Sequence, residues 1–414
     1  MDLEQGASAP AMEAEEAPLI VEVAAEEGVP KEEEEEKEEE KEKEEGRIGG
    51  NNLVMLTERA QLQRLALVLR NTEEPLMRQV IKSEQERVQY LNTVNDAYNQ
   101  TRRLLDDCTA LRDTHERSSQ SQSHALRLQV ARDVHDYVIY GLNLCMQNVR
   151  NCCMRVDAIA KLRAHYDALA DGLAEDAAGD LESLAAEASQ YRASMWEYCH
   201  SHRSASARAH SRAYSRVLLL EGIDFAELTR RHQLRLGYGG KGEDFEDLED
   251  TQKLEVYNSI IVESGRAKIP LLAGLAGRKI ASAKTWGNAV GVFIMAAGNM
   301  VWDVFTAEHN VEAVLRGSLN VMAAVGAFAV DVAVTGAVTK AVASLGAGLF
   351  ATSLAGFVVG AIAGLIFVAV SGRLIDLIFG SPNKVPPVAE LKFHTAVMPD
   401  GMSLAISIAR QSST

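Results

Sequence analysis

The chain of 414 residues contains only five cysteines, an odd number that includes the adjacent pair Cys152 and Cys153. An odd set with an adjacent pair argues against a disulfide framework and favours a reducing compartment. The sequence also lacks an apolar segment close to Met1, where Asp2 and Glu4 stand instead. We therefore expect no secretory signal peptide, and we expect the N-terminal half to be cytosolic.

The motifs that mark common active sites are missing as well. There is no Gly-x-Ser-x-Gly elbow, no His-Glu-x-x-His pair, no phosphate loop and no Cys-x-x-Cys. Cys199, His200 and His202 form the only group of metal-ligand residue types, and on a helix His200 and His202 point about 200° apart. We therefore expect no enzymatic activity, no cofactor and no metal site.

A basic surface is also absent, although the net charge of the chain is -16. Residues 1–50 contain nineteen acids and five bases, so the other residues are close to neutral. Without a basic face interleaved with aromatic residues, nucleic-acid binding has no support. The glutamate-rich composition of residues 1–50 predicts a disordered acidic tail that cannot bury a core.

Proline and glycine are scarce between residues 53 and 219, where Pro75 is the only proline. This scarcity predicts long helices over a first structured region, 51–222. A seven-residue spacing supports the prediction and runs through Val138, Cys145, Cys152, Ile159, Tyr166 and Leu173. Such a spacing is typical of the seam of a coiled coil or an elongated antiparallel helical bundle.

Charge is missing altogether from residues 341–372, a run of thirty-two residues. Small residues recur in this run at about every fourth position: Gly348, Gly356, Gly360, Gly364 and Gly372. On a helix these glycines make one smooth face along which a second helix can approach closely. Because the remaining side chains are apolar, only lipid or other protein can surround such a helix, and we assign the five glycines to membrane-helix packing.

Two further apolar segments precede this run. Residues 285–302 have no charge and carry Trp286 and Trp302 at their ends, which predicts interfacial anchors. We assign Asp303, which follows directly, to the interface too. Residues 319–345 include Asp331 and Lys340, which either line a pore or pair helices, or else lie at helix ends where Lys340 reaches the interface.

The remaining regions complete the predicted organisation. We expect a glycine-rich and acidic hinge over 223–251, an amphipathic helical linker over 252–284, apolar glycine-zipper helices over 285–380 and a tail over 381–414. In the tail, residues 391–397 and 402–408 alternate in hydrophobicity around Pro399, Asp400 and Gly401, which predicts a β-hairpin. The predicted fold class is all-α: an elongated antiparallel helical bundle or coiled coil, followed by a glycine-rich apolar membrane bundle, with a small C-terminal β-hairpin.

The glycine-spaced stretch 356–364, with the residues up to Asp376, resembles the hydrophobic hairpin of colicin-type channel domains and the glycine zippers of polymorphic toxins. The resemblance is to α-helical pore-forming proteins as a class, and the glutamate-rich tail departs from it. It implies a soluble form in which amphipathic helices shield an apolar hairpin until a membrane is met. We therefore expect a membrane-inserting protein whose partners are a lipid bilayer and either further copies of itself, assembled into a pore that conducts ions, or a coiled-coil partner. The alternatives are a passive membrane-anchored coiled-coil tether and a soluble scaffold that buries every apolar helix.

Overall fold

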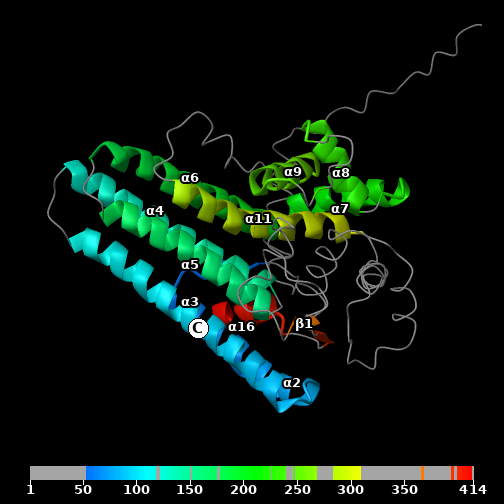
Figure 1. Ribbon diagram of the computed structural model, residues 1–414, viewed down its shortest axis with the longest axis horizontal. Helices are drawn as coiled ribbons and strands as arrows, with labels where there is room; N and C mark the ends of the chain where they lie inside the picture. The colour runs from blue at the N-terminus through cyan, green and yellow to red at the C-terminus, as the bar shows by residue number, and fades with distance from the viewer. Residues whose placement is uncertain are drawn as a thin grey trace, which may run out of the picture. The chain divides into compact units, whose positions relative to one another are not determined.

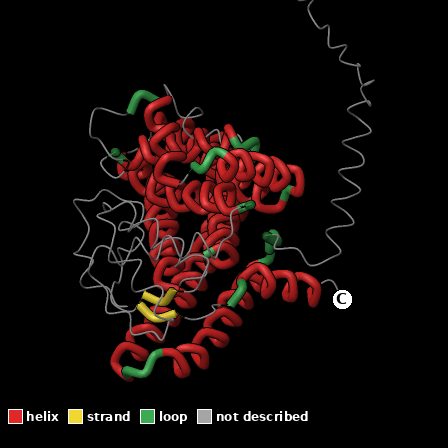
Figure 2. Tube along the Cα trace, turned by 90° about the vertical axis from the view of Figure 1, so that its right-hand side faces the viewer, coloured by secondary structure: helices red, strands yellow, loops and turns green. Residues whose placement is uncertain are grey.

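The scarcity of proline and glycine between residues 53 and 219 is matched by long helices in the described residues of the computed structural model (Figure 1). The structure describes residues 53–117, 122–149, 152–174, 178–223, 225–238, 245, 248–267, 283–308, 365–367, 393–395 and 399–412. Apart from two three-residue strands, the regular elements of this part of the chain are helices (Figure 2). The all-α prediction is therefore confirmed for these residues. The chain divides into Met1–Gly49 and Gly50–Thr414, and the predicted acidic tail lies outside the described residues.

The first region contains six helices. They are α2 (Arg59–Val80), α3 (Glu84–Arg117), α4 (Gln122–Asn148), α5 (Cys152–Ala174), α6 (Ala178–Arg203) and α7 (Ala205–Leu220). Polar contacts give the direction of neighbouring helices. Gln63, near the start of α2, donates to Asp106 in the second half of α3 at 3.1 Å, and Arg70 donates to Asn95 at 2.6 Å. Helices α2 and α3 therefore run antiparallel.

The seven-residue row predicted from the sequence is buried, but it does not follow one continuous helix. Cys145 and Cys152 are both fully buried, yet α4 ends at Asn148 and α5 begins at Cys152. The two halves of the row therefore lie on two helices that pack against each other. Apolar spacing reports which residues face the core, and a short connection can interrupt the helix without disturbing that spacing.

The region predicted as a glycine-rich and acidic hinge, 223–251, contains helix α8 (Phe225–Arg235) among its described residues. Phe225 and Leu228 are buried on one side of α8, and this apolar side stabilises a helix that the nearby glycines and acids obscured. The amphipathic helix expected next is present as α9 (Asp250–Glu263), with Leu254, Ile260 and Ile261 buried.

The predicted C-terminal β-hairpin is wrong in its second strand, 402–408, whereas its first strand, 391–397, contains the observed strand β2 (Phe393–Thr395). Residues Gly401–Ser412 form helix α16, which begins where the Asp400 carboxylate accepts from the Met402 N–H at 3.2 Å and from the Ser403 hydroxyl at 2.6 Å. This capping favours a helix over a turn between strands. The second predicted strand is replaced by a helix that buries Ala405 and Ile408 and contacts α2 and α4.

Two short strands are described near the end of the chain. Strand β1 (Leu365–Phe367) pairs antiparallel with β2 (Phe393–Thr395), with Ile366 opposite His394. The apolar helix predicted over 341–372 is therefore not helical at Leu365–Phe367. Leucine, isoleucine and phenylalanine pack readily in strands, so local composition here is compatible with either structure.

An extended segment enters the bundle before α2 and is held by side chains of α4. Gln147 accepts from the Val54 N–H at 2.9 Å and donates to the Val54 carbonyl at 2.8 Å. Asn143, one turn earlier on α4, makes the equivalent pair of bonds with Leu56. Leu53 and Leu56 are buried, so this segment is part of the core.

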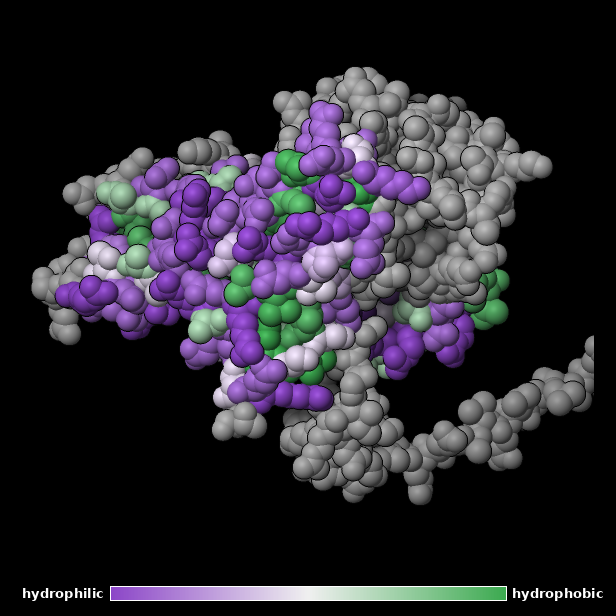
Figure 3. Space-filling view, turned by 90° about the horizontal axis from the view of Figure 1, so that it is seen from below, coloured by the Kyte–Doolittle hydropathy of each residue, from purple (hydrophilic) through white to green (hydrophobic). Residues whose placement is uncertain are grey.

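One ion pair lies wholly inside the bundle. The guanidinium of Arg155 on α5 contacts the carboxylate of Glu73 on α2, and both side chains are buried. Tyr90 on α3 donates to the same carboxylate at 3.4 Å. Burial opposes the charge of Arg155, but the neighbouring Glu73 outweighs it and raises the pKa of Arg155 above its usual value. On the face shown in Figure 3, hydrophilic side chains predominate and hydrophobic ones form smaller groups.

Candidate functional site

Most of the residues singled out in the sequence lie outside the described part of the chain. These are the five glycines Gly348, Gly356, Gly360, Gly364 and Gly372, together with Asp331 and Lys340. The described candidates are Trp286 and Trp302, which both lie on helix α11 (Ala283–Thr306). The candidate site is therefore built around α11.

Helix α11 is the one helix among the described residues that is long and apolar enough to cross a membrane. The apolar segment runs from Trp286 to Phe305, and protein buries 83% of it. A core helix of a soluble protein has the same length and composition, so α11 alone does not distinguish the two settings. Trp286 is half-buried, whereas Trp302 is buried against the rings of Phe225 and Phe305. In this arrangement Trp302 is a core residue, in place of the interfacial anchor predicted from its position.

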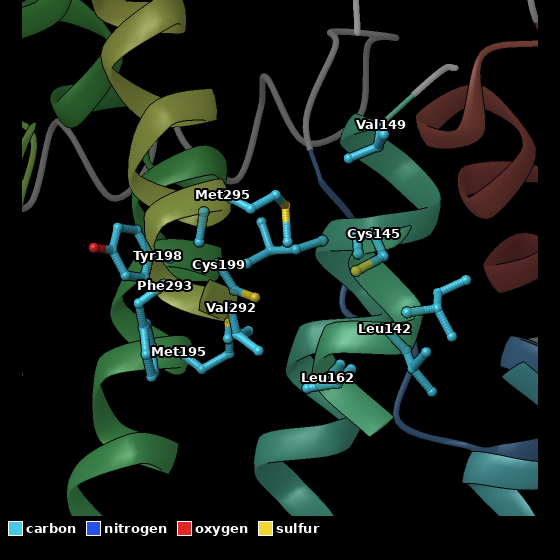
Figure 4. Packing of buried hydrophobic residues seen from close by; sticks show 14 of the residues in the cluster. Leu142, Cys145, Val149, Leu162, Met195, Tyr198, Cys199, Val292, Phe293 and Met295 are labelled. Atoms are coloured by element: carbon cyan, nitrogen blue, oxygen red, sulfur yellow. The ribbon is translucent and has the colours of Figure 1, made fainter. Parts of the chain in front are cut away.

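Helices α5, α6, α7 and α9 surround α11. Val292, Phe293 and Met295 of α11 lie beside Met195, Tyr198 and Cys199 of α6 (Figure 4). The ring of Phe293 is packed among three tyrosine rings, with centroid distances of 6.1 Å to Tyr137, 6.2 Å to Tyr191 and 6.0 Å to Tyr198. Aromatic packing of this kind adds to the burial of apolar area. The middle of α11 is thus held by apolar contacts.

Polar contacts hold the C-terminal end of α11. Asp303 contacts Nδ1 of His202 on α6 at 2.9 Å and the guanidinium of Arg266 at 3.5 Å. His202 and Arg266 are almost fully buried, while the side chain of Asp303 is 41% exposed. Burial raises the pKa of Asp303, but the hydrogen bond and charge of His202 and the charge of Arg266 outweigh it and lower that pKa below its usual value. Asp303 is therefore ionised and bound to the bundle in this arrangement, and its place at a membrane interface stays a prediction.

Gly265 places Arg266 in this contact. It ends α9 with a φ of +69°, a left-handed conformation that glycine adopts without steric cost. The turn directs the Arg266 guanidinium to the Ser201 carbonyl at 3.1 Å and to the Ser211 hydroxyl at 3.0 Å. These bonds join α6, α7 and α9 around Asp303 on α11.

Side chains of α7 bind the last turn of α11 and the residues directly after it. The hydroxyl of Ser215 donates to the Phe305 carbonyl at 2.8 Å and accepts from the Glu308 N–H at 3.0 Å. Arg216 pairs with the Glu308 carboxylate at 3.2 Å. At the other end of α11, Asn288 donates to the Ala164 carbonyl of α5 at 3.1 Å. Helix α11 is therefore apolar in its middle and fixed to the bundle by polar contacts at both ends.

One feature of the sequence indicates that Asp303 makes a contact, and none indicates its partners. Asp303 is the only charged residue between 285 and 307, so it must be exposed or paired. His202 and Arg266 lie far away in the sequence, and no local pattern links them to it.

Cys199, His200 and His202, weighed in the sequence as metal ligands, point to three different neighbours. The Cys199 thiol donates to the Tyr140 carbonyl at 3.4 Å, and the His200 ring stacks on Trp196 with centroids 6.3 Å apart. His202 contacts Asp303. Among the described residues, no group of three or more His, Cys, Asp or Glu side chains could hold a metal ion.

A second polar cluster, missed in the sequence, joins α7, α8 and α9. Nδ1 of His232 lies 2.8 Å from the Ser259 hydroxyl, while Nε2 lies 3.7 Å from the Glu263 carboxylate. Burial, and then the charge of Arg235, lower the pKa of His232 to about 4, so the ring is neutral at pH 7. Glu263 is beyond hydrogen-bond distance of the ring and is engaged by Arg235 and Tyr214. It therefore does not orient the histidine as the acid of a catalytic triad does.

Comparisons with protein-family models, with curated proteins and with solved structures find no match to this chain.

Proposed function

We propose that the protein inserts apolar helices into a lipid bilayer, where they oligomerise and permeabilise the membrane to ions. The helices of the N-terminal half shield α11 beforehand, and the acidic tail remains on the cytosolic side. In this proposal the protein is not an enzyme and needs no cofactor.

The observation that carries the proposal is the way α11 is held. A helix of 24 residues is about 36 Å long, which is enough to cross the apolar core of a bilayer. Its middle makes apolar contacts that lipid can replace. Its ends make the polar contacts of Asp303, Ser215 and Asn288, which are the contacts that insertion must break. Gly348, Gly356, Gly360 and Gly364, which precede strand β1, then supply a face for packing between inserted helices.

The first experiment expresses the full-length chain without detergent and extracts the membranes with alkaline carbonate. Retention in the pellet supports insertion, and ion flux across liposomes then separates a pore from a passive tether. Complete release, with a soluble monomer that causes no flux, contradicts insertion and favours the scaffold that buries its apolar helices. The 83% burial of the apolar part of α11 makes this scaffold the second candidate.

A triple variant tests the glycine face. Gly356→Leu, Gly360→Leu and Gly364→Leu together should abolish ion flux while the chain stays carbonate-resistant. Gly287→Leu is the matched control, because Gly287 is exposed on α11 with no atom near the position of an added side chain. Flux equal to that of the unmodified chain in the triple variant contradicts the role of the glycines. A reversal potential unchanged by Asp331→Asn would remove Asp331 from the pore lining.

A further inference from the structure

Exposed apolar side chains are concentrated in one part of the described chain. Nine large hydrophobic residues are exposed, and six of them belong to α7, α8 and α9 or directly follow them. These six residues, which we call the α7–α9 corner, are Val217, Leu219, Leu220, Leu234, Leu236 and Val262. Leu220 is 81% exposed, so packing covers little of its side chain. A cluster of this kind marks a contact surface.

The three helices that carry the corner are joined to one another. Tyr214 of α7 contacts His232 of α8 at 3.4 Å and Glu263 of α9 at 3.3 Å. Arg231 pairs with Glu221, next to Leu220, at 3.1 Å. In Figure 1 the helices α7, α8 and α9 lie together, as these contacts require.

Positive charge accompanies the apolar residues. Helices α7 and α8 contain six arginines and one acid, Glu227, whereas α9 contains one lysine and three acids. Arg208, Arg212 and Arg216 are spaced four apart on α7 and form one row along that helix. The side chain of Arg216 is 63% exposed even though it pairs with Glu308, and Arg212 is exposed.

The corner is also continuous with the end of α11. Ser215 and Arg216, one turn before Leu219 and Leu220, hold Phe305 and Glu308. A surface bound by the corner would therefore lie close to the point where the chain leaves α11 for the apolar residues beyond it.

We propose that the α7–α9 corner docks on the surface of an anionic lipid bilayer. The protruding leucines enter the boundary between headgroups and acyl chains, and the arginines bind lipid phosphates and the negative surface. The inference rests on the proposed function and names the lipid class that it requires. Docking here precedes insertion and is separable from it.

The test measures co-sedimentation of the full-length chain with vesicles of pure phosphatidylcholine and with vesicles containing a third phosphatidylserine. We expect binding to the anionic vesicles only. The double variant Leu219→Ser with Leu220→Ser should weaken it about tenfold, because two exposed apolar groups are lost. Arg212→Glu should weaken it about tenfold as well, and its effect should shrink as salt is raised.

Two substitutions elsewhere serve as matched controls. Val88→Ser on α3 removes an apolar side chain that is 49% exposed, similar to the 50% of Leu219, and Arg102→Glu reverses an exposed arginine on the same helix. Neither control should change vesicle binding. All four variants alter exposed side chains. Far-ultraviolet circular dichroism checks that each variant remains helical.

Each outcome decides between docking and insertion. Equal binding to both vesicle types overturns docking. Corner variants that bind and insert like the unmodified chain also overturn docking, but they leave the proposed insertion unaffected. Corner-dependent binding that alkaline carbonate fully reverses supports docking and contradicts insertion. A change of oligomeric state in the corner variants without a change in vesicle binding assigns the corner to contacts between copies and overturns the proposal.

Discussion

The side-chain amide of Asn143 bonds both backbone groups of Leu56, accepting from its N–H at 3.0 Å and donating to its carbonyl at 2.9 Å. Asn143 is fully buried and also donates to the Ile139 carbonyl of its own helix at 2.9 Å. The amide therefore substitutes for a neighbouring strand, and it fixes the place where the chain enters the helical bundle.

Removing this amide leaves two buried backbone groups without partners. We expect Asn143→Ala to lower the free energy of unfolding by about 2–4 kcal/mol, measured by urea denaturation. Asn92→Ala, at an exposed position of α3, is the control and should change stability by less than about 0.5 kcal/mol. Equal effects of the two substitutions would show that water or another side chain takes over the bonds of Leu56.

The buried pair of Glu73 and Arg155 predicts strong asymmetry between single and double variants. Glu73→Gln leaves the charge of Arg155 buried and uncompensated, and we expect a loss of about 3–5 kcal/mol in unfolding free energy. Changing both residues to methionine should recover most of that loss, because no charge then remains to be desolvated. A double variant less stable than Glu73→Gln would mean that the pair itself stabilises the fold.

His165 makes the fold sensitive to acid. Nδ1 of His165 lies 2.7 Å from the Tyr137 hydroxyl, and burial lowers the pKa of His165 to about 3. Between about pH 6.5 and pH 3 the unfolded chain binds a proton that the folded protein excludes, so stability falls as the pH falls. The contribution of this residue is about 1.4 kcal/mol per pH unit within that window.

The dependence of stability on pH is measured by urea denaturation at about pH 7 and about pH 5.5, which lie on either side of the ordinary histidine pKa. His165→Gln keeps an acceptor for Tyr137 and cannot titrate, so its stability should fall less between the two conditions. The same slope in both proteins would assign the acid sensitivity to other groups, with His232, whose pKa burial also lowers, as the next to test.

Asp303 gives a local prediction for α11. Asp303→Asn removes the charge that faces His202 and Arg266, and we expect a loss of about 1–2 kcal/mol, reduced by the partial exposure of the side chain. Hydrogen exchange in Ala283–Thr306 should accelerate more than in α3. Glu308→Gln breaks only the exposed pair with Arg216 and should have a much smaller effect. A larger effect of Glu308→Gln than of Asp303→Asn would show that α11 is held mainly by its contact with α7.

Periodicity predicted which residues are buried better than it predicted where helices end. The row from Val138 to Leu173 is buried, but the break between α4 and α5 left no proline or glycine as a signal. At the C-terminus, Met402, Leu404, Ile406 and Ile408 alternate as a strand would, and yet they form α16. There the Asp400 cap and the packing of Ala405 and Ile408 on the bundle decide the structure.

The candidate site was predictable only in part. An apolar helix after residue 284 follows from composition, because eighteen uncharged residues must be covered by lipid or protein. The cover itself was not predictable, since the tyrosines around Phe293 and the partners of Asp303 are brought together by packing of distant segments. For the same reason, no local pattern distinguished a buried Trp302 from an interfacial one.

The two ends of the long stretch that follows α11 are fixed to different helices of the same bundle. Glu308 is bound by Ser215 and Arg216 of α7, and α16 is packed on α2 and α4. A chain anchored at both ends must return to the side from which it departs. In the proposed insertion this constraint holds only while both anchorages do, and breaking the contact of Ser215 with Glu308 removes it.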